Sequence, residues 1–143
     1  MNKKAEEFKK YLETKNITCF TVEEVADDSL NSVVFRSSIE IEGVQLPTII
    51  ILDSSIYGMV RVLVAPNALK ESNEIDLLRE TNTINGKYKV FKYYFGSNGD
   101  LYLESCILLS KGKVDGDLIY TILDVIIKHL QEEYKKMMQL IWK

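Results

Sequence analysis

Apolar and polar side chains alternate most regularly along residues 33–41. A period of two predicts a strand with one buried face. If Glu42 and Gly43 form a two-residue turn, residues 44–52 become a second strand, antiparallel to the first. The apolar positions of the two strands then coincide, and the predicted pairs are Ile41 with Val44, Ile39 with Leu46, Phe35 with Ile50, and Val33 with Leu52.

A third strand is predicted over residues 57–65, after the turn residues of the sequence DSS at 53–55. Pro47 interrupts the second strand. Because proline has no N–H to donate to a ladder, we expect this part of the strand to lie at a sheet edge or at a non-bonded position.

The N-terminal segment has helical periodicity, with apolar positions among lysines and glutamates at Ala5, Phe8, Tyr11 and Leu12. This spacing predicts a short amphipathic helix ending near Asn16. The β-branched residues of 17–25 then favour a strand, which would be the first of the sheet.

Two further helices are predicted in the second half of the chain. One spans residues 67–82, with Asn67 as its N-cap and an inner side formed by Leu69, Ile75 and Leu78. The other spans residues 117–142, where a broad apolar stripe is wider than a coiled-coil seam. The element order is therefore α-β-β-β-β-α-β-β-α, which predicts an α+β fold with a mainly antiparallel sheet in one domain, 1–143.

The sequence FKYYFGSNGDLYLESC, residues 91–106, predicts a tight β-hairpin. Asn98 and Gly99 tolerate positive φ values, so we expect them to be the two central residues of a type I′ turn. In that register one face is aliphatic and suits a core, with Val90, Leu103 and Ile107. The other face carries the aromatic residues and ends at Leu108; its members are Phe91, Tyr93, Phe95, Tyr102 and Leu108.

This second face would be an unusually large apolar patch if it met water. Two interpretations stay open at this point. One of the chain's own helices covers it, or it is a contact surface for a second copy of the chain or a client protein, since aromatic residues are enriched in protein interfaces.

The composition argues against several other functions. Eighteen Lys and Arg against 21 Asp and Glu give a net charge of -3, which makes nucleic acid an unlikely partner. The charged N-terminus resembles neither a signal peptide nor an anchor, and no apolar run is long enough to cross a bilayer, so we expect a cytoplasmic protein without a membrane partner. Cys19 and Cys106 are expected to stay reduced.

No motif indicates catalysis, a cofactor or a bound metal. His129, the single histidine, has Glu132 and Glu133 three and four residues after it, but no nucleophile accompanies this group. We interpret His129 as a dispensable residue at the edge of a helix stripe and predict no catalytic residues, no cofactor and no metal site.

The element order, together with LLRETNTINGKYKVFKYYFGSNGDLYLESCILL at residues 77–109, resembles the YbjN-like proteins, which share the fold of the type III secretion chaperones. The matching residues are a pair of asparagines at the end of a helix, Asn82 and Asn85, and a turn formed by Asn98, Gly99 and Asp100. The resemblance implies a small, non-enzymatic domain that dimerises or holds a partner segment.

We therefore expect a non-enzymatic protein-binding module, chaperone-like or regulatory, whose partner is a second copy of itself, a protein client, or both. The alternative is a signalling regulator that binds a small ligand in a pocket between sheet and helices. A co-purifying polypeptide would favour the first interpretation, and a co-purifying small molecule the second.

Overall fold

The computed structural model describes residues 1–109 and 113–143. Their element order confirms the predicted α+β fold. The elements are α1 (Lys3–Thr14), β1 (Thr21–Glu24), β2 (Val33–Ile41), β3 (Val44–Leu52), β4 (Tyr57–Ala65), α2 (Glu74–Lys87), β5 (Lys92–Phe95), β6 (Leu101–Leu108) and α3 (Gly116–Ile141).

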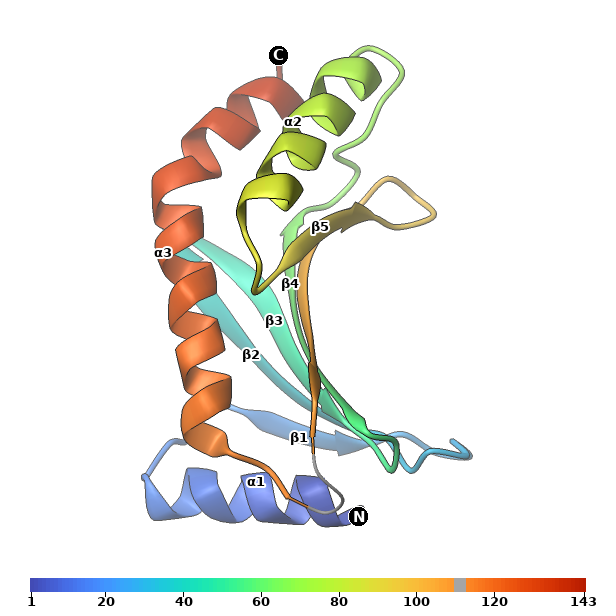
Figure 1. Ribbon diagram of the computed structural model, residues 1–143, viewed down its shortest axis with the longest axis vertical. Coiled ribbons are helices and arrows are strands. Elements are labelled where there is room, and N and C mark those ends of the chain that lie inside the picture. Colours follow the sequence, from blue (N-terminus) through green and yellow to red (C-terminus); the bar gives the residue numbers. More distant parts are fainter. Residues whose placement is uncertain (110–112) are drawn as a thin grey trace.

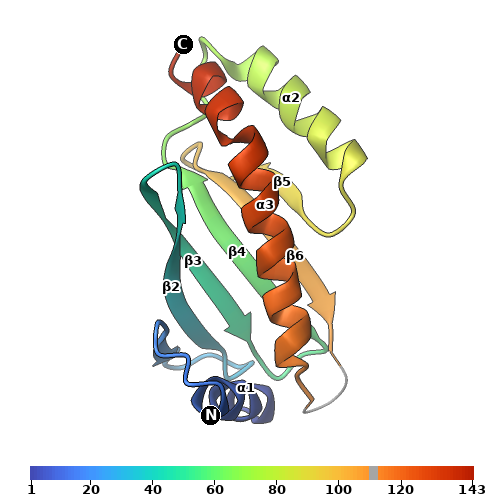
Figure 2. The same ribbon diagram turned by 90° about the vertical axis from the view of Figure 1, so that its left-hand side faces the viewer.

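The strands form one antiparallel sheet in the order β1-β2-β3-β4-β6-β5. Helix α3 crosses one face of the sheet, α1 lies across one end, and α2 lies beside β5 and the C-terminal half of α3 (Figures 1 and 2). None of the helices formed by the described residues lies on the opposite face of the sheet (Figure 1). The sheet is therefore covered on one side only, and its core lies between the sheet and α3.

The β2–β3 hairpin has the predicted register, including all four predicted apolar pairs. Glu42 and Gly43 both have positive φ, 51° and 76°, as a two-residue type I′ turn requires. The prediction for Pro47 is also confirmed, because the ladder between β3 and β4 begins at the next residue, Thr48, which pairs with Val62. β3 and β4 therefore separate at Pro47, which has no N–H to donate to the ladder.

Helix α2 begins and ends later than predicted, and a different side of it is buried. Asn73, not Asn67, precedes its first residue. The Asn73 side chain accepts from Lys70 N and donates to Ala68 O and Ile141 O, so it folds residues 68–73 into a turn and ties them to the end of α3. The buried residues of α2 are Leu77, Thr81 and Ile84, whereas Ile75 and Leu78 are exposed.

The β5–β6 turn differs from the predicted two-residue type I′ turn. Gly99 N donates to Gly96 O and Gly96 N donates to Asp100 O, both at 2.9 Å, so the loop has three residues, 97–99. Gly99 takes the left-handed conformation, with φ 81°, that such a loop needs at its last position. The added residue shifts the whole hairpin register by one.

A contact with the segment before α2 holds this turn. The Gly99 carbonyl accepts from Ala68 N and Leu69 N at 2.9 and 3.0 Å, and the Asp100 side chain accepts from Asn67 N at 2.7 Å. The approach is close, because a Cβ added to Gly99 would lie 2.9 Å from Leu69 O. The turn type is therefore determined by residues thirty positions earlier in the chain.

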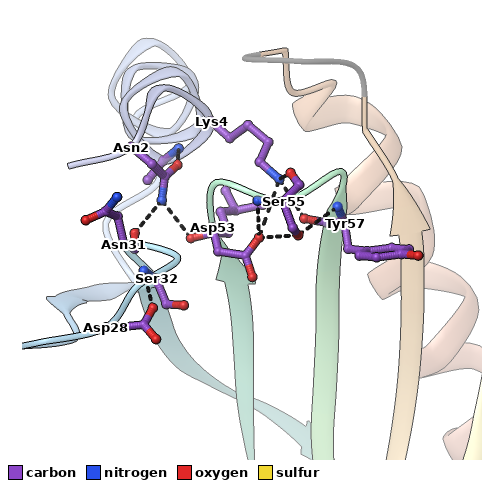
Figure 3. Close-up of polar contacts among 10 residues, drawn as sticks. Asn2, Lys4, Asp28, Asn31, Ser32, Asp53, Ser55 and Tyr57 are labelled. Atoms are coloured by element: carbon purple, nitrogen blue, oxygen red, sulfur yellow. Dashed lines mark hydrogen bonds and ion pairs between the residues drawn. The ribbon is translucent and has the colours of Figure 1, made fainter.

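Helix α1 is held to the end of the sheet by a group of polar side chains (Figure 3). The buried Lys4 ammonium donates to Ser55 O and Tyr57 O, each at 2.6 Å, and lies 3.9 Å from the Asp53 carboxylate. Burial lowers the pKa of Lys4, and the nearby Asp53 charge opposes that shift. Asn2 caps the helix through Ala5 N and also donates to Leu52 O.

Gly99→Ala should destabilise the fold by at least about twice as much as Gly43→Ala, which we expect to cost about 1 kcal/mol. Both glycines have positive φ, but only a Cβ at Gly99 would meet a neighbouring backbone atom. Urea unfolding of both variants measures the difference. Equal losses would show that the contact with Leu69 O does not constrain the turn.

Lys4→Met should lower the free energy of unfolding by about 1–3 kcal/mol, because two partly buried carbonyls would lose the buried ammonium that donates to them. Lys3→Met is the matched control, since Lys3 is the adjacent lysine of the same helix and is exposed. We expect the control to change stability by less than about 0.5 kcal/mol in the same unfolding experiment. A comparable loss in both variants would contradict this role for Lys4.

Candidate protein-binding surface

The register of the β5–β6 hairpin divides the predicted aromatic face between the two sides of the sheet. Tyr93 pairs with Leu103 and Tyr94 pairs with Tyr102. The predicted two-residue turn at Asn98 and Gly99 would have paired Tyr94 with Leu103, so the predicted register is wrong by one residue. Three of the five predicted partner-binding residues lie on the helix side, namely Phe91, Tyr93 and Phe95; Tyr102 and Leu108 lie on the opposite side.

Phe91 and Tyr93 are core residues in this structure, with exposed fractions of 1% and 4%. They cannot form a surface without a change in the fold. Of the two open interpretations, coverage by the chain's own helices describes this part of the hairpin. A partner-binding role for Tyr102 and Leu108 stays a prediction.

Asn85 attaches β5 to the end of α2. Its side chain accepts from Tyr93 N at 2.7 Å and donates to Tyr93 O at 3.1 Å, as a neighbouring strand would. The Lys92 ammonium adds contacts at 2.6 Å to Asn85 O and Tyr88 O. One of the two asparagines that carry the family resemblance thus has a structural role in orienting the hairpin.

His129 lies inside this hairpin–helix contact, not at the edge of a helix as the sequence suggested. It is 3% exposed and is surrounded by the rings of Tyr88, Phe91 and Tyr93, with centroids 4.5–5.6 Å away. Its Nε2 shares a hydrogen bond of 2.8 Å with Tyr93 Oη, and Nδ1 has no partner among the described residues. Burial lowers the pKa of His129 to about 4, so the ring is neutral at pH 7.

The sheet face without helices, which we call the open face, is largely apolar. Its side chains are those that alternate with the core residues of β3, β4, β5 and β6. Most of them are partly or fully exposed. The open face consists of Ile49, Ile51, Met59, Arg61, Leu63, Tyr94, Tyr102, Glu104, Cys106 and Leu108.

One ion pair lies within the open face, between Arg61 Nε and Glu104 Oε2 at 3.3 Å. The Arg61 guanidinium also lies 5.5 Å from the centre of the Tyr102 ring, which stacks on Tyr94 with centroids 5.3 Å apart. Burial, with Glu104 nearby, raises the pKa of Tyr94 to about 12. The charges here are paired with each other, which leaves apolar and aromatic surface around them.

Several hollows lie at the periphery of the described part of the chain. The first, about 450 Å³, lies between the start of α1 and the β3–β4 turn, beside Lys4 and Asp53, which form an ion pair. One of about 300 Å³ opens where β3 and β4 separate, beside Pro47 and Trp142. The hollow between the sheet and α3, near Thr48, has only about 120 Å³.

Metal-binding side chains do not gather in threes anywhere in residues 1–109 and 113–143. Cys19 and Cys106 are both free and exposed. No described helix has the length and apolarity needed to cross a membrane. His129 has carboxylates on its own helix but is enclosed by aromatic rings, and its hydrogen-bond partner among the described residues is the buried Tyr93 hydroxyl.

Sequence reasoning missed the residues that β3 and β4 contribute to the open face. The predicted partner-binding residues do not include Ile49, Ile51, Met59 and Leu63, because the aromatic residues of the hairpin are the more conspicuous interface signal. A signal was present, since the run of three isoleucines at 49–51 places apolar side chains on both faces of one strand.

His129→Gln should remove part of the acid sensitivity of the fold. The unfolded His129 protonates near its usual pKa of 6.5 and the folded one only near 4, so its contribution to stability is complete above pH 6.5 and is lost as the pH falls towards 4. Between pH 4 and 6.5, the unfolding free energy of the wild type should rise with pH more steeply than that of the variant, by up to about 1.4 kcal/mol per pH unit.

Urea unfolding at several pH values between 4 and 7.5 measures these slopes, and glutamine preserves an acceptor for Tyr93 while it cannot titrate. The ionisable groups in contact with His129, Tyr88 and Tyr93, are retained in the variant, as is Glu133, whose charge acts on Tyr93. Parallel stability curves for the two proteins would contradict the burial of a neutral histidine.

A search of curated proteins found no match. A model of the YbjN family, described as "putative bacterial sensory transduction regulator", matches residues 7–137. These residues include most of α1, the complete sheet, α2 and most of α3. The chain therefore belongs to the YbjN family.

Proposed function

We propose that this chain is a non-enzymatic regulatory module that acts in the cytoplasm by binding protein, and that two copies associate. The observation that carries the proposal is the open face, an apolar side of a six-stranded sheet that no described helix covers. Contiguous apolar surface of this kind marks interaction sites in proteins. The family description, which concerns regulation, supports the same class of function.

The composition of the open face suits a protein partner. It combines aliphatic side chains of β3 and β4 with two stacked tyrosines of the hairpin, and its central charges, Arg61 and Glu104, are already paired. Interfaces are enriched in tyrosine, methionine and arginine, and have few unpaired charges in their centre. Tyr102 and Leu108 keep their predicted partner-binding role here, in a different setting from the one expected.

A small-ligand regulator is the weaker proposal. Ligand pockets usually enclose about 300–1,000 Å³. The hollow between sheet and helices has about 120 Å³, and the larger ones are open at the surface. A client-binding chaperone would use the same open face, and the experiment below identifies its client directly.

Replacing Leu63 with Asp and Tyr102 with Ser should weaken association by at least about tenfold, because these cross-strand neighbours lie within the open face. Native mass spectrometry of protein from its own cells identifies the bound polypeptide, and sedimentation equilibrium gives the dimer constant. Melting temperatures check that the variant stays folded.

The matched control is Ile75→Asp with Leu78→Ser, which removes exposed apolar side chains from α2 and leaves the sheet unchanged. Association should be unaffected by it. If the wild-type protein is monomeric and carries a small molecule in place of a polypeptide, the proposed function is wrong.

A further inference from the structure

The outer edge of β6 is covered by another strand over only half its length. β5 pairs with Leu101–Glu104 of β6, and its last paired residue on this side is Lys92. β6 continues to Leu108 and remains paired with β4 on its other side. Residues 105–108 therefore form a half-open sheet edge, visible beyond β5 in Figure 2.

The alternation of antiparallel pairing shows which backbone groups lie on this edge. Leu109 N donates to Ile56 O, so odd-numbered residues of β6 bond towards β4 and even-numbered residues point the other way. The N–H and C=O groups of Cys106 and Leu108 consequently face outwards. None of these groups has a hydrogen-bond partner among the described residues. The edge thus offers two donors and two acceptors in strand geometry.

The edge at the opposite side of the sheet is different. β1 also covers only part of its neighbour, pairing with residues 33–36 of β2. The exposed remainder of β2 carries Ser38 and Glu40, which bond to Gln45. Polar and charged side chains of this kind protect an edge from pairing with other chains. The β6 edge has Cys106 and Leu108 in the corresponding places, and Leu108 is 72% exposed.

The surroundings of the β6 edge are apolar and positively charged. Residues 89–91, which precede the last paired residue Lys92, diverge from β6 and leave a hollow of about 300 Å³. Lys89 and Lys92 line it, and Lys87 lies nearby in sequence at the end of α2. No carboxylate of the described residues lies within ion-pair distance of these three lysines, while Glu104, the acidic residue of the hollow, is paired with Arg61. The net charge beside the edge is positive, although the whole chain carries -3.

We propose that the edge of β6 at Cys106 and Leu108 binds an extended, acidic segment of a partner protein, which adds to the sheet as a further strand. Addition of a strand satisfies the free backbone groups, and alternate side chains of the segment would rest on the apolar open face beside them. The lysines select negative charge. A second copy of this chain fits less well, because residues 105–108 of its own β6 carry no carboxylate that could pair with Lys89 and Lys92.

This inference rests on the proposed protein-binding function and names the kind of partner and its place. The probe is an acetylated peptide of about eight residues that alternates valine with glutamate. Two further peptides of the same length serve as comparisons. One has lysine in place of glutamate, and the other is N-methylated at alternate amides, which blocks strand pairing. Fluorescence polarisation should show binding of the first peptide alone, weakened at high salt.

The two free cysteines report where the peptide binds. Cys106 lies at the proposed edge, and Cys19 lies in the segment before β1 at the far side of the sheet. Both are exposed, so both react with iodoacetamide in the free protein. The acidic peptide should slow alkylation of Cys106 several-fold and leave that of Cys19 unchanged. Equal protection of both cysteines, or of neither, would overturn the proposal.

Leu108→Pro is the decisive variant, because it deletes an outward N–H that makes no bond in the fold. It should weaken peptide binding by at least about tenfold with little change in melting temperature. Leu108→Ala retains the N–H and should bind more tightly than the proline variant. The double variant Lys87→Glu, Lys89→Glu should abolish the preference for the acidic peptide.

The outcome also separates this inference from the proposed function. If Leu108→Pro binds the acidic peptide as tightly as the wild type does, the edge does not take an acidic segment. The same conclusion follows if the wild-type protein is a dimer that does not bind the peptide, and Leu108→Pro makes it monomeric. In a third outcome, a natural partner binds Leu108→Pro normally but fails to bind the variant with Leu63 and Tyr102 replaced. That result would preserve the proposed function and refute the inference.

Discussion

The two hydrogen bonds from Ala68 and Leu69 to the Gly99 carbonyl fix the geometry on which both sides of the sheet depend. They hold a three-residue turn, and the turn sets which residues of β5 face the helices. With this register, Phe91 and Tyr93 enter the core and close around His129, while Tyr94 joins Tyr102 on the open face. A sheet strand cannot slip by one residue without exchanging its two faces. The core under α3 and the surface opposite it are therefore determined together.

Polar contacts, in addition to apolar packing, attach each helix to the rest of the molecule. Lys4 ties α1 to the β3–β4 turn, Asn73 ties the start of α2 to the last turn of α3, and Asn85 ties the end of α2 to β5. Each contact is made to backbone carbonyls, whose positions follow from the fold itself. Such bonds specify one arrangement of the elements, because a misplaced partner leaves a buried polar group unsatisfied. His129 is the exception, since its Nδ1 has no described partner.

The predictable part of this structure is the part set by local sequence. The β2–β3 register follows from Glu42, Gly43 and the alternation around them, which agree with each other. The β5–β6 register was missed because Asn98 and Gly99 suit two turn types, and a contact with Leu69 decides between them. The helix start is predicted too early for a related reason. Asn67 resembles an N-cap, but its N–H bonds to Asp100 as part of the segment that holds the turn. The partner-binding residues are predicted from the wrong hairpin register, so only two of them, Tyr102 and Leu108, lie on the exposed side.

The strand order has a consequence for how the molecule is made. β6 lies between β4 and β5, although it follows both along the chain. Strands β1 to β4 can pair successively as hairpins during synthesis, but the far edge of β4 remains without its neighbour until α2, β5 and the loop after it have emerged. Completion of the sheet is thus an insertion step. During that interval β4 is paired with β3 along one edge only, and its residues Val60, Val62 and Val64 are uncovered because α3, which packs over them in the finished fold, has not yet been synthesised.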